Sequence, residues 1–297
     1  MPGLSRMHAD EVAIDSALVR RLLTGQFPHW SALPLEPVPS AGTDNALFRL
    51  GSDLVVRLPR IDWAVPAVDK EQHWLPRLAP HLPAAVPLPI GRGEPAEGYP
   101  WPWSVYRWLD GESPDPDHLD DAEGLAVELA GFVAALHRID PTGGPPAGRG
   151  VPLAEREEDT RAAIDSLAEM VDTAAVTAAW EQDLHAPAWT GPPVWVHGDL
   201  SPGNLLLVDG RLAAVIDFGG LGVGDPACDL IVAWNLLPAD GRDAFRTGLQ
   251  VDDATWQRGR GWALSIALIQ LPYYLSTNPP LAASARHVIR EVLAATV

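Results

Sequence analysis

Cysteine and lysine are almost absent from the 297-residue sequence, which contains one of each, Cys228 and Lys70. A single cysteine excludes an internal disulfide and is typical of a reducing compartment. Residues 1–11 contain no apolar stretch of signal-peptide length, so the sequence predicts a cytoplasmic protein.

Long hydrophobic runs are also missing. The longest apolar region, residues 262–275, contains Gln270 and Pro272 and falls short of the roughly 20 residues that span a bilayer. It predicts a buried helix and no membrane partner. With 47% hydrophobic and 20% charged residues, the composition is typical of a globular protein, and the length favours about two domains.

Positive charge is scarce, and the formal net charge is −18. Binding to nucleic acid or to an anionic membrane depends on clustered Lys and Arg, so we expect neither partner. The acidic balance favours encounter with a cationic small molecule, but acidity also serves solubility without any such ligand. Both interpretations stay open.

Two short motifs carry groups suited to handling protons and metal ions. The segment H-G-D-L-S-P-G-N begins at His197 and contains Asp199 and Asn204, and I-D-F-G follows with Asp217 thirteen residues after Asn204. The first matches the kinase catalytic loop H-x-D-x-x-x-x-N, and the second matches the D-F-G metal ligand. In this chemistry Asp199 takes a proton from an acceptor hydroxyl, while Asn204 and Asp217 bind Mg²⁺. Each motif alone also matches common turns, but the pair in this spacing indicates phosphoryl transfer.

Short apolar runs surround these motifs. Residues 194–196 lead into the first motif, and residues 204–208 and 212–216 flank an Asp-Gly pair that is a hairpin signal. We therefore expect Asp199 and Asp217 at the tips of neighbouring strands, facing one cleft.

The sequence resembles the aminoglycoside phosphotransferase family, the antibiotic-kinase branch of the protein-kinase-like fold. That family has H-G-D in its catalytic loop where protein kinases have H-R-D, and Gly198 provides this variant. The downstream G-D-P-A-C-D-L, from Gly224 to Leu230, resembles the family's G-D-P-x-x-D-L segment. These motifs lie within residues 197–230, and the rest of the chain is similar in length and element order.

The resemblance implies an α+β, bilobal protein-kinase-like fold. A small N-terminal lobe with an antiparallel sheet, residues 1–108, would bind the nucleotide. A larger, mainly helical C-terminal lobe, residues 109–297, would carry the catalytic and substrate-binding groups. The resemblance also implies ATP or GTP as phosphoryl donor, Mg²⁺ as cofactor, and a small-molecule acceptor such as a cationic antibiotic.

The first lobe contains a predicted hairpin formed by residues 46–50 and 54–58. Residues 40–45 are rich in turn formers, and the resemblance implies that this turn covers the nucleotide phosphates, with Gly42 and Thr43 among its contacts. The segment lacks the protein-kinase G-x-G-x-x-G, so without the resemblance it is an ordinary turn.

A strand cation and a helix carboxylate follow the hairpin. Arg57 ends the second strand where kinases place the lysine that grips the nucleotide phosphates, and Glu71 opens a helical pattern fourteen residues later. A guanidinium can also bind phosphate, although its planar fork needs a different placement. Lys70 is a second candidate for this cation, and Arg57 could instead face solvent.

Residues 104–109 predict a strand that ends at an Asp-Gly pair. By resemblance this strand is the hinge between the lobes, where backbone groups of Arg107 and Leu109 hydrogen-bond the nucleotide base. No stacking role is assigned to the tryptophans, because core packing accounts for most tryptophans in a chain with twelve of them.

Apolar spacing predicts helices over residues 10–23, 120–139 and 160–184, with Asp10 or Asp15 capping the first. The acidic stretch before the third helix either recognises amines of a substrate or suits the positive end of the helix dipole.

Three polar residues are assigned supporting roles outside the catalytic set. By resemblance, Asp229 braces the catalytic-loop backbone and His197 is a scaffold residue, not the base. A histidine on one face of a helix, His137, is predicted to hydrogen-bond in the core.

The pattern as a whole predicts a kinase that phosphorylates a hydroxyl of an aminoglycoside-like or other natural-product antibiotic. One alternative is a metabolite kinase acting on choline, homoserine or a sugar, because the same loop serves those acceptors. Another is a catalytically silent nucleotide-binding regulatory module. A protein kinase is disfavoured, because no A-P-E segment follows Asp217.

Overall fold

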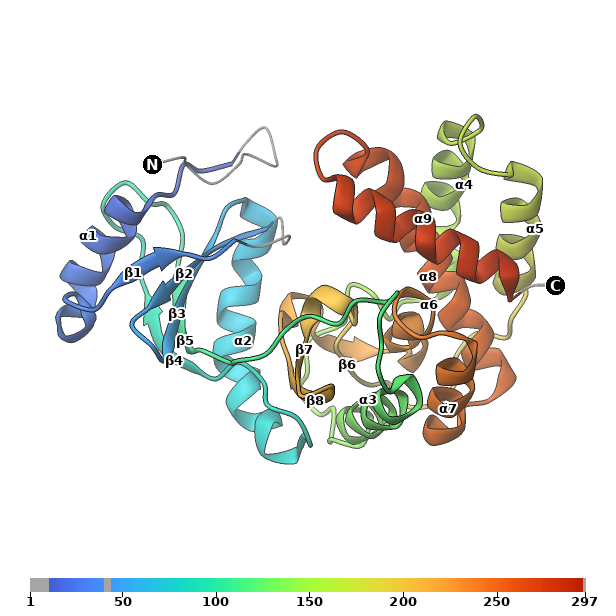
Figure 1. The fold of residues 1–297 in the computed structure, drawn as a ribbon, viewed down its shortest axis with the longest axis horizontal. Coiled ribbons are helices and arrows are strands. Elements are labelled where there is room, and N and C mark those ends of the chain that lie inside the picture. The colour runs from blue at the N-terminus through green and yellow to red at the C-terminus, as the bar shows by residue number, and fades with distance from the viewer. Residues whose placement is uncertain (1–10, 40–43, 296–297) are drawn as a thin grey trace. The chain divides into compact units, whose positions relative to one another are not determined.

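The computed structural model describes residues 11–39 and 44–295, which form two compact units (Figure 1). The first unit comprises the described residues up to Pro80 together with Ala85–Asp110. The second comprises His81–Ala84 and the described residues from Gly111 onward. Within the described ranges, no helix combines the length and apolar character needed to cross a bilayer.

The first unit is built on an antiparallel sheet. Its strands within the described residues are β1 (Leu35–Pro37), β2 (Asn45–Leu50), β3 (Leu54–Pro59), β4 (Pro89–Gly93) and β5 (Trp103–Arg107), and they lie in the order β1-β2-β3-β5-β4. The predicted hairpin is confirmed, because β2 pairs with β3 around a turn at Gly51, whose φ is +63°. This positive φ is a conformation that glycine adopts without steric cost.

Side chains alternate between the two faces of this sheet, as the strand period of two requires. One face packs against helix α1 (Ser16–Gln26), whose apolar side chains share a core with Phe48, Val56 and Val105. Arg57 alternates with Val56 along β3 and therefore points to the other face. Helix α2 (Val65–Leu78) runs beside the sheet (Figure 1) and carries Glu71, which binds Arg57.

Helix α1 begins at the later of its two predicted caps. The carboxylate of Asp15 accepts a hydrogen bond from the backbone N–H of Leu18 at 2.7 Å, which makes Asp15 the N-cap and Ser16 the first helical residue. An N-cap carboxylate satisfies a donor that has no partner inside the helix, so it sets the helix start. The other candidate cap, Asp10, lies outside the described residues.

The second unit is mainly helical, with two short antiparallel ladders among its described residues. One ladder pairs β6 (Val194–Val196) with β9 (Gly222–Gly224), and the other pairs β7 (Leu205–Val208) with β8 (Arg211–Val215). The predicted turn between β7 and β8 is confirmed. Both Asp209 and Gly210 have positive φ, 50° and 76°, as a two-residue hairpin turn of this kind requires.

The α-helices of this unit are α3 (Ala122–His137), α4 (Glu157–Ser166), α5 (Thr173–Leu184), α6 (Val232–Asn235), α7 (Ala239–Leu249), α8 (Asp253–Tyr274) and α9 (Pro279–Ala294). Short 3-10 turns across both units are Pro28–Trp30, Asp62–Ala64, Ala79–His81, Leu153–Arg156, Pro202–Asn204, Phe218–Gly220 and Pro226–Ile231. The apolar region that predicted a buried helix forms most of α8, where Trp262, Leu264 and Leu268 are fully buried. Helices α8 and α9 pack along each other (Figure 1).

The prediction of one helix over residues 160–184 is wrong. The chain leaves α4 after Ser166 and starts α5 at Thr173, because Asp172 adopts an extended conformation and its carboxylate accepts from the N–H of Ala175 at 3.0 Å. The competition between such a side-chain cap and a continuous helix is decided locally, and apolar spacing does not register it.

Two nearly buried ion pairs fasten α8 to its surroundings. Arg260 binds the carboxylate of Asp183 on α5 at 2.6 Å, and Arg258 binds that of Asp225 at 2.7 Å. Burial raises the pKa of Asp183, and the hydrogen bond and charge of Arg260 act against that rise.

Candidate active site

The first predicted motif forms a loop between β6 and β7 in the second unit. His197 is fully buried at its start, with its ring against Phe218 at a centroid separation of 4.6 Å. Its Nε2 lies 3.0 Å from the carbonyl oxygen of Ile216, and its Nδ1 accepts from the N–H of Asp199 at 3.1 Å. Both ring nitrogens therefore hold backbone, as expected of a scaffold residue.

Asp229 braces the start of the loop through backbone hydrogen bonds. Its fully buried carboxylate accepts hydrogen bonds from the backbone N–H groups of His197 and Gly198, at 3.0 and 2.8 Å. The Nε2 of His137 lies 3.2 Å from the same carboxylate. The structural roles predicted for Asp229 and His137 are thereby confirmed.

The backbone geometry at the second position of this motif, Gly198, requires glycine. Its φ is +80°, and a Cβ placed there would lie 2.8 Å from the carbonyl oxygen of Gly220. Any side chain would therefore meet both backbone strain and a steric clash with backbone.

Asp199 and Asn204 are brought into direct contact by the loop. The amide nitrogen of Asn204 donates to the backbone oxygen of Asp199 at 2.8 Å and to its carboxylate Oδ2 at 3.1 Å. With the amide nitrogen used in this way, its oxygen is the atom suited to hold a cation. The side chain of Asp199 is 38% exposed, so its carboxylate can be reached by a small molecule.

Asp217 lies two residues beyond the end of β8, the strand that pairs with β7, and β7 begins directly after Asn204. The N–H of Ile216 donates to the carbonyl of Asn204 at 2.8 Å, which extends the ladder by one pair and places Asn204 opposite the residue that precedes Asp217. Asp217 has the left-handed conformation, with φ 59° and ψ 72°. Non-glycine residues rarely adopt this conformation, and those that do are frequent at functional sites.

The donor set of these two residues suits Mg²⁺. The ion prefers oxygen ligands and typically takes one or two protein groups, with substrate phosphates and water completing its shell. Among the described residues, no group of three or more His, Cys, Asp or Glu side chains gathers as a metal site. One carboxylate and one amide oxygen fit an ion whose remaining ligands are phosphates and water.

Sequence reasoning missed Arg149. Its Nη1 binds the carboxylate Oδ1 of Asp199 and also donates to the carbonyl oxygen of Gly198 at 3.1 Å. The residue lies in an irregular segment rich in Gly and Pro, where no periodic pattern marks it. Only the folded backbone brings it to the loop.

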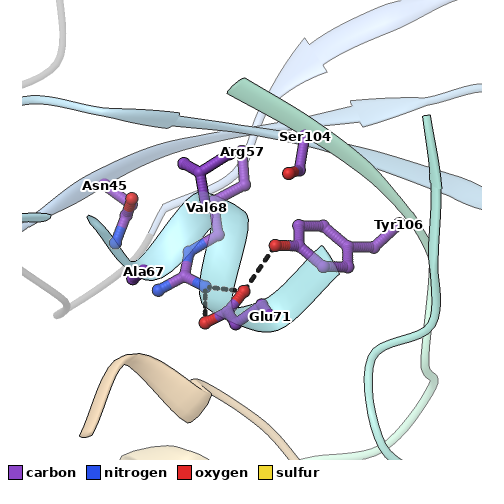
Figure 2. A pocket seen from close by; sticks show the side chains of 7 residues that line it. All are labelled: Asn45, Arg57, Ala67, Val68, Glu71, Ser104 and Tyr106. Atoms are coloured by element: carbon purple, nitrogen blue, oxygen red, sulfur yellow. Dashed lines mark hydrogen bonds and ion pairs between the residues drawn. The ribbon is translucent and has the colours of Figure 1, made fainter. Parts of the chain in front are cut away.

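The first unit holds the predicted cation and carboxylate together (Figure 2). Nη1 of Arg57 lies 2.6 and 2.7 Å from the two carboxylate oxygens of Glu71, and the Glu71 side chain is 1% exposed. Arg57 therefore binds Glu71 and does not face solvent, and its contact with phosphate stays a prediction. The pocket around them is lined by Asn45, Arg57, Ala67, Val68, Glu71, Ser104 and Tyr106.

Two further residues complete this cluster and were not identified from the sequence. The hydroxyl of Tyr106 donates to Glu71, and burial, followed by the negative charge of Glu71, raises the pKa of that phenol well above its usual value. The side-chain oxygen of Asn45, with the amide turned toward Arg57, accepts from Nη2 at 2.9 Å and from Nε at 3.2 Å. The guanidinium is thus held from two sides.

Two of the remaining predicted nucleotide contacts, Arg107 and Leu109, lie at and just after the end of β5. The N–H of Arg107 donates to the carbonyl of Leu88 at 3.2 Å, so the carbonyl of Arg107 is its backbone group suited to a base. Leu109 follows β5 as half-buried, irregular backbone. Gly42 and Thr43 lie outside the described residues.

Comparison with known proteins gives consistent results. The model of the Phosphotransferase enzyme family matches residues 36–262. An aminoglycoside 3'-phosphotransferase of Escherichia coli is 27% identical over 125 residues, which are 41% of this chain and 46% of that protein. Another from Escherichia coli is 49% identical over 45 residues, 15% of this chain and 17% of that protein. The chain thus matches less than half of the length of either relative.

Solved structures are similar over nearly the whole chain. The GDP and kanamycin complex of APH(2")-IIia has a TM-score of 0.77 at 21% identity, covering 94% of this chain and 99% of that one. The macrolide 2'-phosphotransferase MphH from Brachybacterium faecium has a TM-score of 0.64 at 24% identity, covering 92% and 97%. These similarities confirm the predicted fold, with a small antiparallel-sheet lobe and a larger, mainly helical lobe.

Proposed function

The chain belongs to the phosphotransferase enzyme family, and we propose that it is a small-molecule kinase with an antibiotic as acceptor. It would transfer the γ-phosphoryl group of ATP or GTP to a hydroxyl of an aminoglycoside-like or other natural-product antibiotic. The proposal is supported by relatives that are named aminoglycoside phosphotransferases and by similar structures solved with GDP or ADP.

Asp199 is the proposed general base. As the acceptor hydroxyl oxygen forms its bond to the γ-phosphorus, the bond from that phosphorus to the β-phosphate bridging oxygen breaks. The hydroxyl proton passes to the carboxylate of Asp199, and the nucleoside diphosphate leaves with the electron pair of the broken bond. Catalysis of this kind depends chiefly on positioning, and the hydrogen bonds from Asn204 to Asp199 provide it.

Asn204 and Asp217 are the proposed Mg²⁺ ligands. When bound, the ion neutralises charge on the phosphate oxygens. The chain's own contribution is to fix the backbone near both ligands. The hydrogen bond from Ile216 to the carbonyl of Asn204 does this, because it joins the segment that enters β7 to the segment that leaves β8.

Arg57 is proposed to steady the nucleotide phosphates. Its guanidinium is fixed by Glu71 and Asn45, so little side-chain entropy remains to be lost when phosphate binds. Gly42 and Thr43 in the preceding turn, and backbone groups of Arg107 and Leu109, are proposed to contact the rest of the nucleotide.

The observation that carries the proposal is the pair of hydrogen bonds by which Asn204 fixes the backbone and the carboxylate of Asp199. The test is phosphate transfer from ATP and from GTP, with Mg²⁺, to a panel of aminoglycosides, macrolides and nucleoside antibiotics, followed by mass spectrometry of the acceptors. Choline, homoserine and sugars in the same panel test the metabolite-kinase alternative. Exclusive turnover of a metabolite would overturn the antibiotic assignment, and Mg²⁺-dependent nucleotide binding without any product would indicate the silent module.

A further inference from the structure

One arginine outside both motifs holds the proposed base. Nη1 of Arg149 binds the carboxylate of Asp199 and, at 3.1 Å, the carbonyl oxygen of Gly198. A side chain and a backbone group of the same loop are therefore tied by one nitrogen. The Arg149 side chain is 35% exposed, so it is not forced against Asp199 by packing in a core.

The segment that carries Arg149 is docked onto the ladder that feeds the catalytic loop. The N–H of Ala147 donates to the carbonyl of Val223 at 3.1 Å, and the N–H of Val223 donates to that of Pro145 at 2.8 Å. Val223 belongs to β9, which pairs with β6, and β6 ends one residue before His197. The segment thus extends the sheet from which the loop emerges.

The other end of the segment is fixed equally firmly. The N–H of Asp225 donates to the carbonyl of Gly150 at 2.8 Å, and the thiol of Cys228 donates to the carbonyl of Arg149 at 3.2 Å. A Cβ on Gly224 would lie 2.5 Å from the Gly150 oxygen, so the two backbones are in close contact there. Asp225 is itself held by two nearly buried hydrogen bonds from Arg258, at 2.7 and 3.1 Å.

This anchoring distinguishes Arg149 from an ordinary surface ion pair. An exposed ion pair usually adds little stability, because ordering a long, mobile arginine side chain costs conformational entropy. Here the backbone on both sides of Arg149 is fixed by hydrogen bonds, so the contact with Asp199 loses less side-chain and backbone freedom. A supporting group on a rigid element is the arrangement that catalytic residues require.

We propose that Arg149 is a positioning residue for phosphoryl transfer, which holds the Asp199 carboxylate and the Gly198 carbonyl in the orientation that receives the acceptor hydroxyl. The inference rests on the proposed function, because it assigns the orientation of the base in that reaction. Arg149 acts through Asp199 and need not touch the acceptor itself.

The test compares Arg149→Met and Arg149→Lys with the wild-type protein in steady-state transfer of phosphate from Mg²⁺-nucleotide to the acceptor found in the panel. We expect Arg149→Met to lower kcat by about 10- to 100-fold, the cost of a small misplacement of a catalytic group. The KM for nucleotide should stay within about twofold, and Arg149→Lys should recover part of kcat because it restores a donor and a positive charge.

Arg211→Met is the matched control, because Arg211 also binds a carboxylate, that of Glu128, but is 75% exposed and lies beside the turn between β7 and β8, at the end of that ladder away from Asn204. Its kcat should equal that of the wild type. A double-mutant cycle adds Asp199→Asn, and the Arg149→Met change should then have little further effect.

The outcomes separate the inference from the proposed function. A wild-type protein that transfers no phosphate to any acceptor contradicts the proposed function. An active wild type with Arg149→Met as active as Arg211→Met overturns the positioning role, as does a rise in acceptor KM with kcat unchanged. If Arg149→Met does not fold, Arg149→Lys decides: a partial loss of kcat without a change in thermal stability supports the role, and wild-type kcat contradicts it.

Discussion

Arg57 binds both carboxylate oxygens of Glu71 through one guanidinium nitrogen, at 2.6 and 2.7 Å. Glu71 is almost fully buried, so replacing it with alanine leaves the Arg57 charge without its partner in a poorly solvated site. We expect Glu71→Ala to lower the free energy of unfolding by about 3 kcal/mol, measured by urea denaturation. Arg92→Ala breaks the more exposed pairs with Asp69 and Glu94 and should cost less than about 1 kcal/mol. Equal losses for the two variants would contradict this reasoning.

The proposed base gives a kinetic prediction. Asp199→Asn keeps the size of the side chain and removes its ability to take a proton, so kcat should fall about 10³-fold. Nucleotide affinity, measured by calorimetry with Mg²⁺ and ADP, should remain near that of the wild type. Asp209→Asn is the same change in the exposed turn between β7 and β8, where asparagine also tolerates positive φ, and it should leave kcat unchanged. Nearly normal turnover in Asp199→Asn would remove this residue from the mechanism.

The glycine of the catalytic loop makes a prediction about stability. Gly198→Ala combines a φ of +80° with a Cβ 2.8 Å from the Gly220 oxygen, and we expect a loss of about 1–3 kcal/mol in the free energy of unfolding. Gly131→Ala lies on an exposed face of α3, with nothing within 4 Å of the new Cβ, and should stabilise by about 0.5–1 kcal/mol. Thermal denaturation of the two variants should shift in opposite directions.

The metal ligands predict how nucleotide binding depends on Mg²⁺. ADP with Mg²⁺ should raise the melting temperature of the wild type, because a ligand that binds only the folded state stabilises it. Asp217→Asn should remove most of the difference between ADP with Mg²⁺ and ADP with EDTA. Asp243→Asn changes an exposed carboxylate on α7 and should keep that difference. A wild type whose response to ADP is the same with EDTA would argue against metal binding at Asp217.

The cap of α8 predicts a dependence of stability on pH. The carboxylate of Asp252 accepts from the N–H of Thr255 at 2.7 Å, and hydrogen bonds from the Thr255 side chain and backbone lower the pKa of Asp252 below its ordinary value of 3.8. A lowered folded-state pKa means that the stabilisation is complete above about pH 4 and is lost as the pH falls through the folded-state value. Asp252→Ala should therefore cost about 1 kcal/mol at pH 7 and less at pH 3.

Asp252→Asn separates the cap from its charge. Asparagine also caps helices, so this variant should keep most of the stability at pH 7 and show a smaller dependence on pH than the wild type. Urea denaturation at both pH values gives the comparison. A pH dependence identical to that of the wild type would mean that Asp252 contributes no charge effect.

Local patterns were enough to predict parts of the fold and of the candidate site. The hairpin between β2 and β3 and the turn at Asp209 follow from alternation and turn chemistry, which act over a few residues. The pairing of Arg57 with Glu71 and the bracing role of Asp229 were predicted from motif spacing and family resemblance. Each depends on a contact that the motif itself specifies.

Other features depend on tertiary backbone contacts that no spacing reveals. Arg149 reaches Asp199 only because β9 holds residues 145–150 against the catalytic loop, and that docking uses main-chain groups common to all sequences. Tyr106 meets Glu71 because its face of β5 turns toward α2, and sequence alternation gives the face but not the partner. The break between α4 and α5 depends on one N-cap residue, Asp172.

The thiol of Cys228 is fully buried beneath the segment that carries Arg149. Burial, and then the charges of Asp229 and Asp225, raise its pKa well above the usual value, so it is protected from alkylating reagents both by cover and by protonation. Since the chain has no other cysteine, a thiol-reactive dye can label the protein only when this region opens. The rate at which Cys228 is labelled therefore measures local opening of the structure beside the catalytic loop, and no engineered cysteine is needed.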